Sequence, residues 1–254
     1  MKNWTLNLIA YSTFLSASLY SLPAHSASFN CNKASSTVEH LICTNPELSK
    51  LDESLALQYK AEREDAKDNK YDYSDEIRAK QIQWLTFQRN TCTDESCLLR
   101  EYQERLGCDK EHDGHCGNEH GRSDIVDNKA FGTFAESIRI TFYNPEAPNN
   151  EDVSNFTNEI SIHKVEQLPY LAVIDSTLIF DRGHTCNIGE VLATWAQNHW
   201  VLKDTYDGKN LELRFYPATH NGKTKLLVRD IDDHYRESAC GMRGYFDGLV
   251  FERQ

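Results

Sequence analysis

The stretch from Gln81 to Leu106, QIQWLTFQRNTCTDESCLLREYQERL, decides the fold of the first half of the chain. Residues recur in it at helical spacing on both sides of a polar turn: Gln81, Trp84, Leu85 and Gln88 before the turn, and Leu98, Leu99, Tyr102 and Leu106 after it. The turn, Thr93–Ser96, has residue types that favour turns and helix N-caps. The stretch therefore predicts two helices joined at a corner, which Cys92 and Cys97 flank.

Helix-start signals precede this stretch. Ser36 with Glu39 three residues later has the pattern of a capping box, and Asn45-Pro46 is typical of the start of a further helix. The apolar stripe of that helix consists of Leu48, Leu51, Leu55 and Tyr59. The polar residues between them are expected to face water: Glu47, Lys50, Asp52 and Glu53.

Two long helices are expected in this region, one from Pro46 to about Asp65 and one from about Ser74 to Thr91. A short polar connection between them predicts that they pack antiparallel. Its tip contains Tyr71, Asp72 and Tyr73. Tyrosines beside an acidic residue in an exposed loop suit partner binding, and we take these three residues as candidate contacts. The alternative is that the tyrosines pack back onto the bundle.

The chain contains eight cysteines, an even number that predicts disulfides formed in an oxidising compartment. Antiparallel helices would place the start of the first near the end of the second. This arrangement favours Cys43–Cys92 and leaves Cys31 to pair with Cys97. Pairing of near neighbours, Cys31 with Cys43 and Cys92 with Cys97, is the alternative.

A set of spaced residues runs through positions 28–107. It consists of Ser28–Ala34, Val38-Glu39, Leu41–Cys43, Leu48, Leu51-Asp52, Leu55, Tyr59, Gln81, Trp84-Leu85, Arg89, Cys92 and Cys97-Leu98. This set resembles the LprI-type lysozyme-inhibitor family. The resemblance covers under half of the chain and implies a helical domain that inhibits lysozyme.

The N-terminus, Met1–Ser26, has the pattern of a secretory signal peptide. It carries Lys2, then a stretch of mostly apolar residues, and Ala24-His25-Ser26 places small residues at the −3 and −1 positions of a cleavage site. No cysteine follows a cut after Ser26, which argues against a lipid anchor. The sequence therefore predicts an exported protein, and the Gram-negative periplasm is the expected compartment.

Residues 108–126 form a predicted linker, rich in glycine, charge, cysteine and histidine. His112, His115 and His120 have side chains that bind zinc or copper, although their spacing fits no standard finger. A local Cys108–Cys116 disulfide is the simpler interpretation of the cysteines, because oxidised cysteines do not bind metal. We therefore expect no metal or other cofactor.

From residue 127 onward the pattern changes to alternation of apolar and polar residues, the period of half-buried strands. The candidate strands are Ser137–Tyr143, Glu159–Val165, Tyr170–Phe180, Val191–Ala196, Trp200–Lys203, Leu211–Tyr216, Thr224–Arg229 and Tyr245–Glu252. Asp207-Gly208 and Asn221-Gly222 are strong hairpin turns. The predicted class is therefore α+β: a disulfide-linked helical bundle over 27–107, followed by an antiparallel β barrel or sandwich over 127–254.

Two segments of this second half resemble the β module often fused to the LprI-type domain. They are Cys186–Gly189 and Cys240–Gly248. The resemblance implies a Cys186–Cys240 disulfide that ties an early strand to the last one.

The residues that suggest catalysis have simpler interpretations. His184 and Asp181 lie near Cys186, but a disulfide-bonded cysteine is no nucleophile. Asp230, Asp232, Asp233 and His234 form an acidic loop that lacks the glycine and terminal glutamate of a calcium loop. No phosphate loop, triad order or zinc-protease motif is present, so we expect no enzymatic activity.

The charge of the chain indicates the kind of partner. It has 27 basic and 39 acidic side chains, and loss of Lys2 with the signal leaves 26, so 26 minus 39 gives a mature net charge of −13. Such a surface repels nucleic acid and anionic membranes and attracts a cationic protein. The expected partner is a cationic lysozyme or other peptidoglycan hydrolase.

The sequence therefore predicts an exported protein that occludes the cationic cleft of lysozyme, or of a related peptidoglycan-cleaving enzyme, with an acidic or tyrosine-bearing loop. One alternative is a periplasmic immunity protein against a delivered toxin. Another is an envelope accessory or metal-binding protein that uses the linker histidines.

Overall fold

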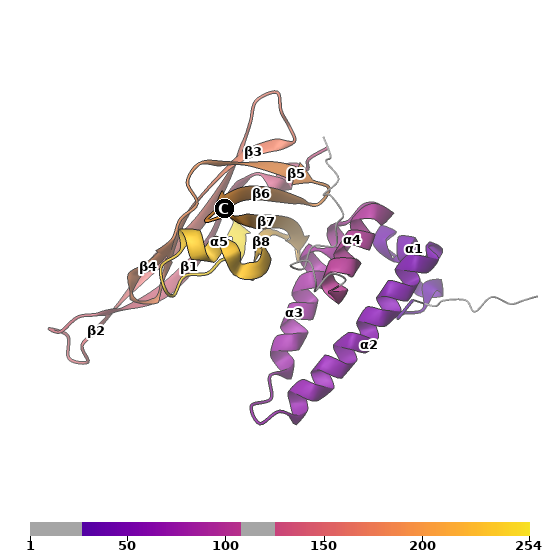
Figure 1. The fold of residues 1–254 in the computed structure, drawn as a ribbon, viewed down its shortest axis with the longest axis horizontal. Helices are drawn as coiled ribbons and strands as arrows, with labels where there is room; N and C mark the ends of the chain where they lie inside the picture. Colours follow the sequence, from indigo (N-terminus) through magenta and orange to yellow (C-terminus); the bar gives the residue numbers. More distant parts are fainter. Residues whose placement is uncertain (1–26, 108–124) are drawn as a thin grey trace, which may run out of the picture.

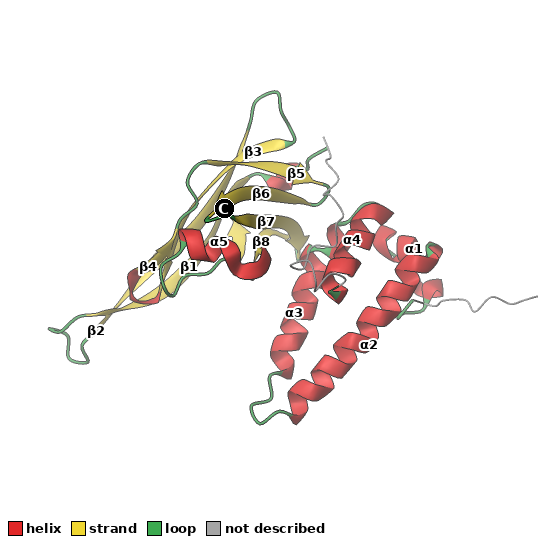
Figure 2. Ribbon diagram, viewed as in Figure 1, coloured by secondary structure: helices red, strands yellow, loops and turns green. Residues whose placement is uncertain are grey.

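The structure, a computed structural model, describes residues 27–107 and 125–254. The first range, the helical region, is α-helical, and the second, the barrel, is an antiparallel β barrel (Figure 1, Figure 2). The predicted α+β class is confirmed, as a barrel and not a sandwich. The predicted signal peptide, the Cys108–Cys116 pair and the three linker histidines (His112, His115 and His120) lie outside the described residues.

The helical region contains six elements: η1 (Cys31–Lys33), α1 (Thr37–Thr44), α2 (Pro46–Asp68), α3 (Ser74–Phe87), η2 (Arg89–Thr91) and α4 (Glu95–Leu106). The predicted capping box is present, with Ser36 accepting from the backbone N–H of Glu39. Asn45 caps α2 with Pro46 at its first position. Within 27–107 and 125–254, no helix is both long and apolar enough to cross a membrane.

The helices α2 and α3 run as a long hairpin away from α1 and α4 (Figure 1). They meet at a loop around Tyr71, whereas α4 packs against α2 at the opposite end. The predicted antiparallel arrangement is therefore present. The core between the helices includes Leu48, Leu55, Trp84 and Tyr102, and the rings of Trp84 and Tyr102 meet edge to face at 5.1 Å.

Asp52 is buried at the centre of this core, with 4% of its surface exposed, so the prediction that it faces water is wrong. It accepts hydrogen bonds from the Tyr102 hydroxyl at 2.6 Å and from the backbone N–H of Ser28 at 2.8 Å. Arg89 Nη1 lies 3.8 Å from its carboxylate. Burial raises the pKa of Tyr102, so the phenol keeps the proton that it donates. Asp52 therefore joins the N-terminal segment, α2, η2 and α4.

The disulfides of the helical region join near neighbours. Cys31 pairs with Cys43 and Cys92 with Cys97, with Cα–Cα distances of 5.7 and 5.5 Å. The predicted Cys43–Cys92 and Cys31–Cys97 pairs are therefore wrong. The turn of η1 and α1 brings Cys31 back to Cys43, and the four residues between Cys92 and Cys97 form a tight corner, so both pairs reach bonding distance locally. Packing, not cross-linking, joins α2 to α3.

The barrel contains β1 (Gly132–Tyr143), β2 (Glu151–Lys164), β3 (Leu171–Phe180), β4 (His184–Cys186), β5 (Val191–Ala196), β6 (His199–Tyr206), β7 (Lys209–His220), β8 (Lys223–Asp230), α5 (His234–Ala239) and β9 (Val250–Arg253). The strands follow the order β2-β1-β9-β8-β7-β6-β5-β3, and β3 pairs back onto β2. Eight antiparallel strands therefore close a ring, and the ninth, β4, pairs with β3.

The sequence predicted every strand except β4, but its limits were too short for β1, β2, β6 and β7, and its last strand, Tyr245–Glu252, begins five residues before β9. The turns at Asp207-Gly208 and Asn221-Gly222 are confirmed, and all four residues have positive φ. β1 and β2 begin or end well beyond the predicted limits and extend past the ring as a long hairpin (Figure 1). The outer half of β2 is exposed on both faces, so it lacks the alternation that identifies a strand.

A third disulfide ties the barrel wall to the segment after α5. Cys186 of β4 pairs with Cys240, as the resemblance to the β module implied. Gly244 packs against this bond so closely that a Cβ atom there would overlap Cys186 Sγ. Glycine is therefore required at this position of the Cys-Gly-Met-Arg-Gly segment.

Candidate partner-binding site

The helical region docks on the barrel through a two-residue corner between β5 and β6. The corner residue Gln197 has φ of 60°, and the N–H of Asn198 donates to the carbonyl of Ala196 at 2.7 Å. This is a γ-turn with positive φ, which is a strained conformation for a side chain larger than glycine. Because the corner holds this shape, the Gln197 and Asn198 side chains both reach the helical region.

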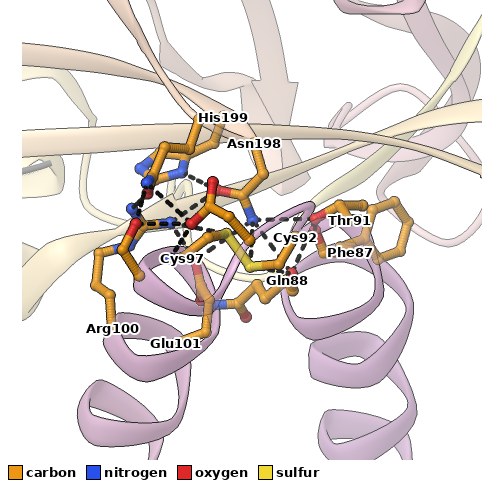
Figure 3. The surroundings of a disulfide bond; sticks show 12 residues. Phe87, Gln88, Thr91, Cys92, Cys97, Arg100, Glu101, Asn198 and His199 are labelled. Atoms are coloured by element: carbon orange, nitrogen blue, oxygen red, sulfur yellow. Dashed lines mark hydrogen bonds and ion pairs between the residues drawn. A yellow bond between two sulfur atoms is a disulfide. The ribbon is translucent and has the colours of Figure 1, made fainter. Parts of the chain in front are cut away.

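Arg100 of α4 receives this corner (Figure 3). Its guanidinium donates to the Gln197 side-chain oxygen and, at 2.8 Å, to Asn198 Oδ1. It also pairs with Glu101 at 2.9 Å. Arg100 is 2% exposed and Glu101 is fully buried, so each charge depends on the other and on these amides.

The corner also holds the end of α3 and the Cys92–Cys97 disulfide (Figure 3). Asn198 Nδ2 donates to the carbonyl of Gln88 at 3.1 Å and to Thr91 Oγ1 at 3.0 Å. Gln88 in turn donates to Glu101 at 3.0 Å. The disulfide fixes the corner of the helical region against which Asn198 packs.

Further contacts extend the interface along β7 and β8. Arg214 pairs with Glu104 of α4, and Arg229 donates to Gln88 Oε1 at 3.2 Å. Phe87 packs in an apolar cluster with Tyr216, Ala218 and Leu227. The interface combines an apolar patch with charged pairs, so the helical region and the barrel hold a defined orientation.

The three predicted contact residues lie at the free end of the α2–α3 hairpin. Tyr71 is 78% exposed, and its ring lies 5.2 Å from Lys70 Nζ instead of packing on the bundle. Asp72 accepts from the backbone N–H of Ser74 at 3.1 Å, and hydrogen bonds from Ser74 lower its pKa. Tyr73 is half-buried at the start of α3. The loop therefore presents one free aromatic ring beside an ionised carboxylate.

A second projecting surface is the β1–β2 hairpin, which sequence reasoning did not select. Its tip carries Glu146, Glu151 and Asp152, all exposed, and Tyr143 is 74% exposed. Asp152 accepts from Asn144 Nδ2 at 2.6 Å, which orders the tip. The signal in the sequence is the absence of lysine and arginine between Arg139 and Lys164.

The acidic loop Asp230–His234 is a turn that caps α5. Asp230 accepts from the backbone N–H groups of Tyr235 and Arg236 at 3.0 and 2.9 Å. Burial, with the charges of Asp233 and Asp247, raises the pKa of Asp230 to about 6. Among the residues that the structure describes, no group of acidic, histidine or cysteine side chains has the arrangement of a metal site.

The residues that suggested a cysteine nucleophile are not assembled for that chemistry. Cys186 is buried in its disulfide with Cys240. Asp181 accepts from the backbone N–H of Thr141 at 3.3 Å, where η4 (Asp181–Gly183) contacts β1. His184 lies against Gly241. These residues hold the β3–β4 connection against its neighbours.

The helical region, which holds the buried Asp52 and the Cys31–Cys43 and Cys92–Cys97 disulfides, is the part of the chain that matches a known family. Residues 30–108 match the family described as "Lysozyme inhibitor LprI". The match covers the LprI-like helices and stops before the barrel. No curated protein and no solved structure matches the chain. The family suggests a lysozyme-inhibitor role for the LprI-like part.

We predict that Arg100→Ala lowers the free energy of unfolding by about 3–5 kcal/mol, because Glu101 would remain buried without its partner. Arg139→Ala is the matched control, since Arg139 is exposed on β1 and its loss should change the stability by less than about 0.5 kcal/mol. Urea unfolding with intact disulfides measures both. Equal effects of the two substitutions would show that the docking contact contributes nothing to the free energy of unfolding.

The raised pKa of Asp230 predicts a pH dependence of stability. Because its pKa in the folded protein, about 6, lies above the ordinary value of 3.8, the folded state binds the extra proton. This contribution is complete below pH 3.8 and is lost as the pH rises through 6. Relative to Asp230→Asn, the wild type should therefore lose stability between about pH 4 and 7.

Unfolding at several pH values tests this, with Asp65→Asn as the control because Asp65 is exposed on α2. The Asp230→Asn variant loses one backbone hydrogen bond at every pH, so only the change with pH of the stability difference between wild type and variant tests the prediction. A constant difference between wild type and Asp230→Asn across that range would contradict the prediction.

Proposed function

We propose that the protein is an exported inhibitor of lysozyme, or of a related peptidoglycan-cleaving enzyme, and that it acts by occluding the cationic cleft of its target. The observation that carries the proposal is the LprI match over residues 30–108. The matched residues form a packed unit with its own buried hub, Asp52. Such a unit can hold a projecting loop rigidly, as an inhibitor requires.

The α2–α3 tip is the first proposed contact surface. Tyr71 presents a large ring with few rotatable bonds, a type of side chain that often dominates interfaces. Asp72 adds a charge that stays ionised because Ser74 donates to it. This tip belongs to the LprI-like part, so it is the surface that the family match favours.

The β1–β2 hairpin tip is the second proposed contact surface. Glu146, Glu151 and Asp152 concentrate negative charge there, whereas Lys67 and Lys70 dilute the charge of the α2–α3 tip. Complementary charge speeds the encounter with a cationic protein and orients it. We propose that the hairpin supplies electrostatic attraction and that Tyr71 supplies buried contact area.

Export to the periplasm is part of the proposal. The Met1–Ser26 segment has the pattern of a secretory signal. The three disulfides within the described residues persist only in an oxidising compartment. A cell wall and any lysozyme that reaches it meet the protein in that compartment.

A lysis assay tests the proposal. Protein comprising residues 27–254 is added to peptidoglycan and a c-type lysozyme, and turbidity is followed at low and raised salt. Stoichiometric inhibition that weakens with salt is the expected result. No inhibition at micromolar protein would contradict the proposal for this target.

The contact surfaces are tested with variants in the same assay. We predict that Tyr71→Ala weakens inhibition at least about tenfold, as loss of an interface anchor does. Glu146→Gln with Glu151→Gln should weaken it mainly at low salt. The controls are Tyr206→Ala, an exposed tyrosine of β6, and Glu190→Gln, an exposed glutamate before β5. If a control variant inhibits as poorly as Tyr71→Ala, the effect is not specific to Tyr71, and the tip is not the contact surface.

A further inference from the structure

A cavity of about 200 Å³ lies where α3 and α4 meet the barrel. Its wall comes from both parts of the molecule: Trp84, Gln88 and Arg105 from the helices, and Arg214, Tyr216 and Arg229 from β7 and β8. The volume is several times that of one water molecule. It is large enough for a small polar ligand group.

Two side chains in the cavity wall contain buried polar atoms without a hydrogen-bond partner among the described residues. These atoms are Nε1 of Trp84 and the hydroxyl of Tyr216. Trp84 is 2% exposed and Tyr216 is fully buried, so bulk water does not hydrate them. An indole N–H can only donate. Burial raises the pKa of Tyr216, so its hydroxyl also keeps a proton to donate.

The cavity also has a cation without a carboxylate partner. Arg214 pairs with Glu104 and Glu212, and Arg229 pairs with Asp247. Arg105 instead donates to Gln81 Oε1 at 3.4 Å, and no acidic group in residues 27–107 or 125–254 lies within ion-pair distance of it. Arg105 therefore makes no ion pair with a described acid, and Glu62 acts on its charge only from beyond ion-pair distance.

The carboxylates at the cavity have other contacts. Glu104 is held by Arg214, and Asp230 accepts from the backbone N–H groups that begin α5. Asp232 is exposed. The two unsatisfied donors and the unpaired guanidinium therefore favour a ligand that accepts hydrogen bonds and carries negative charge.

We infer that this cavity binds a small oxyanion group, a carboxylate or a phosphate. Arg105 neutralises its charge, and Trp84 and Tyr216 donate to its oxygens. The ligand would contact the helical region and the barrel together, so its binding stabilises their docked arrangement. The inference is independent of the proposed inhibition, which the tips carry and not this cavity.

The test uses protein of residues 27–254 with sodium phosphate or sodium acetate against sodium chloride at matched ionic strength. We expect one of the two oxyanions to raise the melting temperature and to change tryptophan fluorescence saturably, because Trp84 lines the cavity. Phosphate acting alone assigns a phosphate ligand, and acetate acting alone assigns a carboxylate ligand. No response to either oxyanion would overturn the inference.

Variants locate the response in the cavity. Arg105→Gln should weaken oxyanion binding at least tenfold, and Arg139→Gln on the exposed face of β1 should leave it unchanged. Tyr216→Phe removes only the hydroxyl and should weaken binding less, which provides a second test if Arg105→Gln does not fold. Unchanged binding in Arg105→Gln, or in Tyr216→Phe where Arg105→Gln does not fold, would overturn the inference.

Discussion

The contact between Arg100 and Asn198 is the interaction on which the arrangement of the molecule depends. It buries a guanidinium at the point where the LprI-like helices meet the barrel, and the γ-turn at Gln197 presents amide oxygens that accept from its two terminal nitrogens. Hydrogen bonds and the ion pair with Glu101 offset the cost of burying this charge. Separation of the barrel would break the hydrogen bonds to the two amides and expose the apolar cluster around Phe87 to water, so the docked state is preferred.

This constraint connects stability to the proposed function. With the barrel fixed by the Arg100 cluster, the α2–α3 tip and the β1–β2 hairpin project from a single rigid body (Figure 1). When a partner contacts both surfaces, the inhibitor then loses little conformational entropy on binding. The disulfides contribute differently: Cys92–Cys97 holds the corner that receives Asn198, whereas Cys186–Cys240 ties β4 to the segment after α5.

The parts of the fold that were predicted from sequence have local causes. The capping box at Ser36, the Asn45-Pro46 start and the Asn221-Gly222 hairpin each act within a few residues. The burial of Asp52 depends on Ser28, Arg89 and Tyr102, which lie far from it along the chain, so periodicity gave the wrong answer there. The Cys92–Cys97 pair is local, and it was missed because the cysteines were paired from the expected packing of the helices. Local signals do not report which side chains meet after folding.

In the candidate site, too, features with local causes were predicted and features that depend on distant contacts were not. A polar loop between two long helices predicted an exposed tip, and Tyr71 is exposed there. The docking role of Gln197 and Asn198 was not predictable, because polar residues in a tight corner look the same whether they face water or another surface. The β1–β2 tip was missed since the outer half of β2 lacks alternation, although the absence of lysine and arginine from this stretch is visible in the sequence.

A protein that occludes the cleft of its target must compete with a ligand bound in that cleft. A chito-oligosaccharide bound to catalytically inactive c-type lysozyme is titrated with protein of residues 27–254, and the bound sugar is measured. We expect sugar and protein to exclude each other, with release of the sugar complete at one equivalent of protein. A ternary complex in which lysozyme holds both would contradict occlusion.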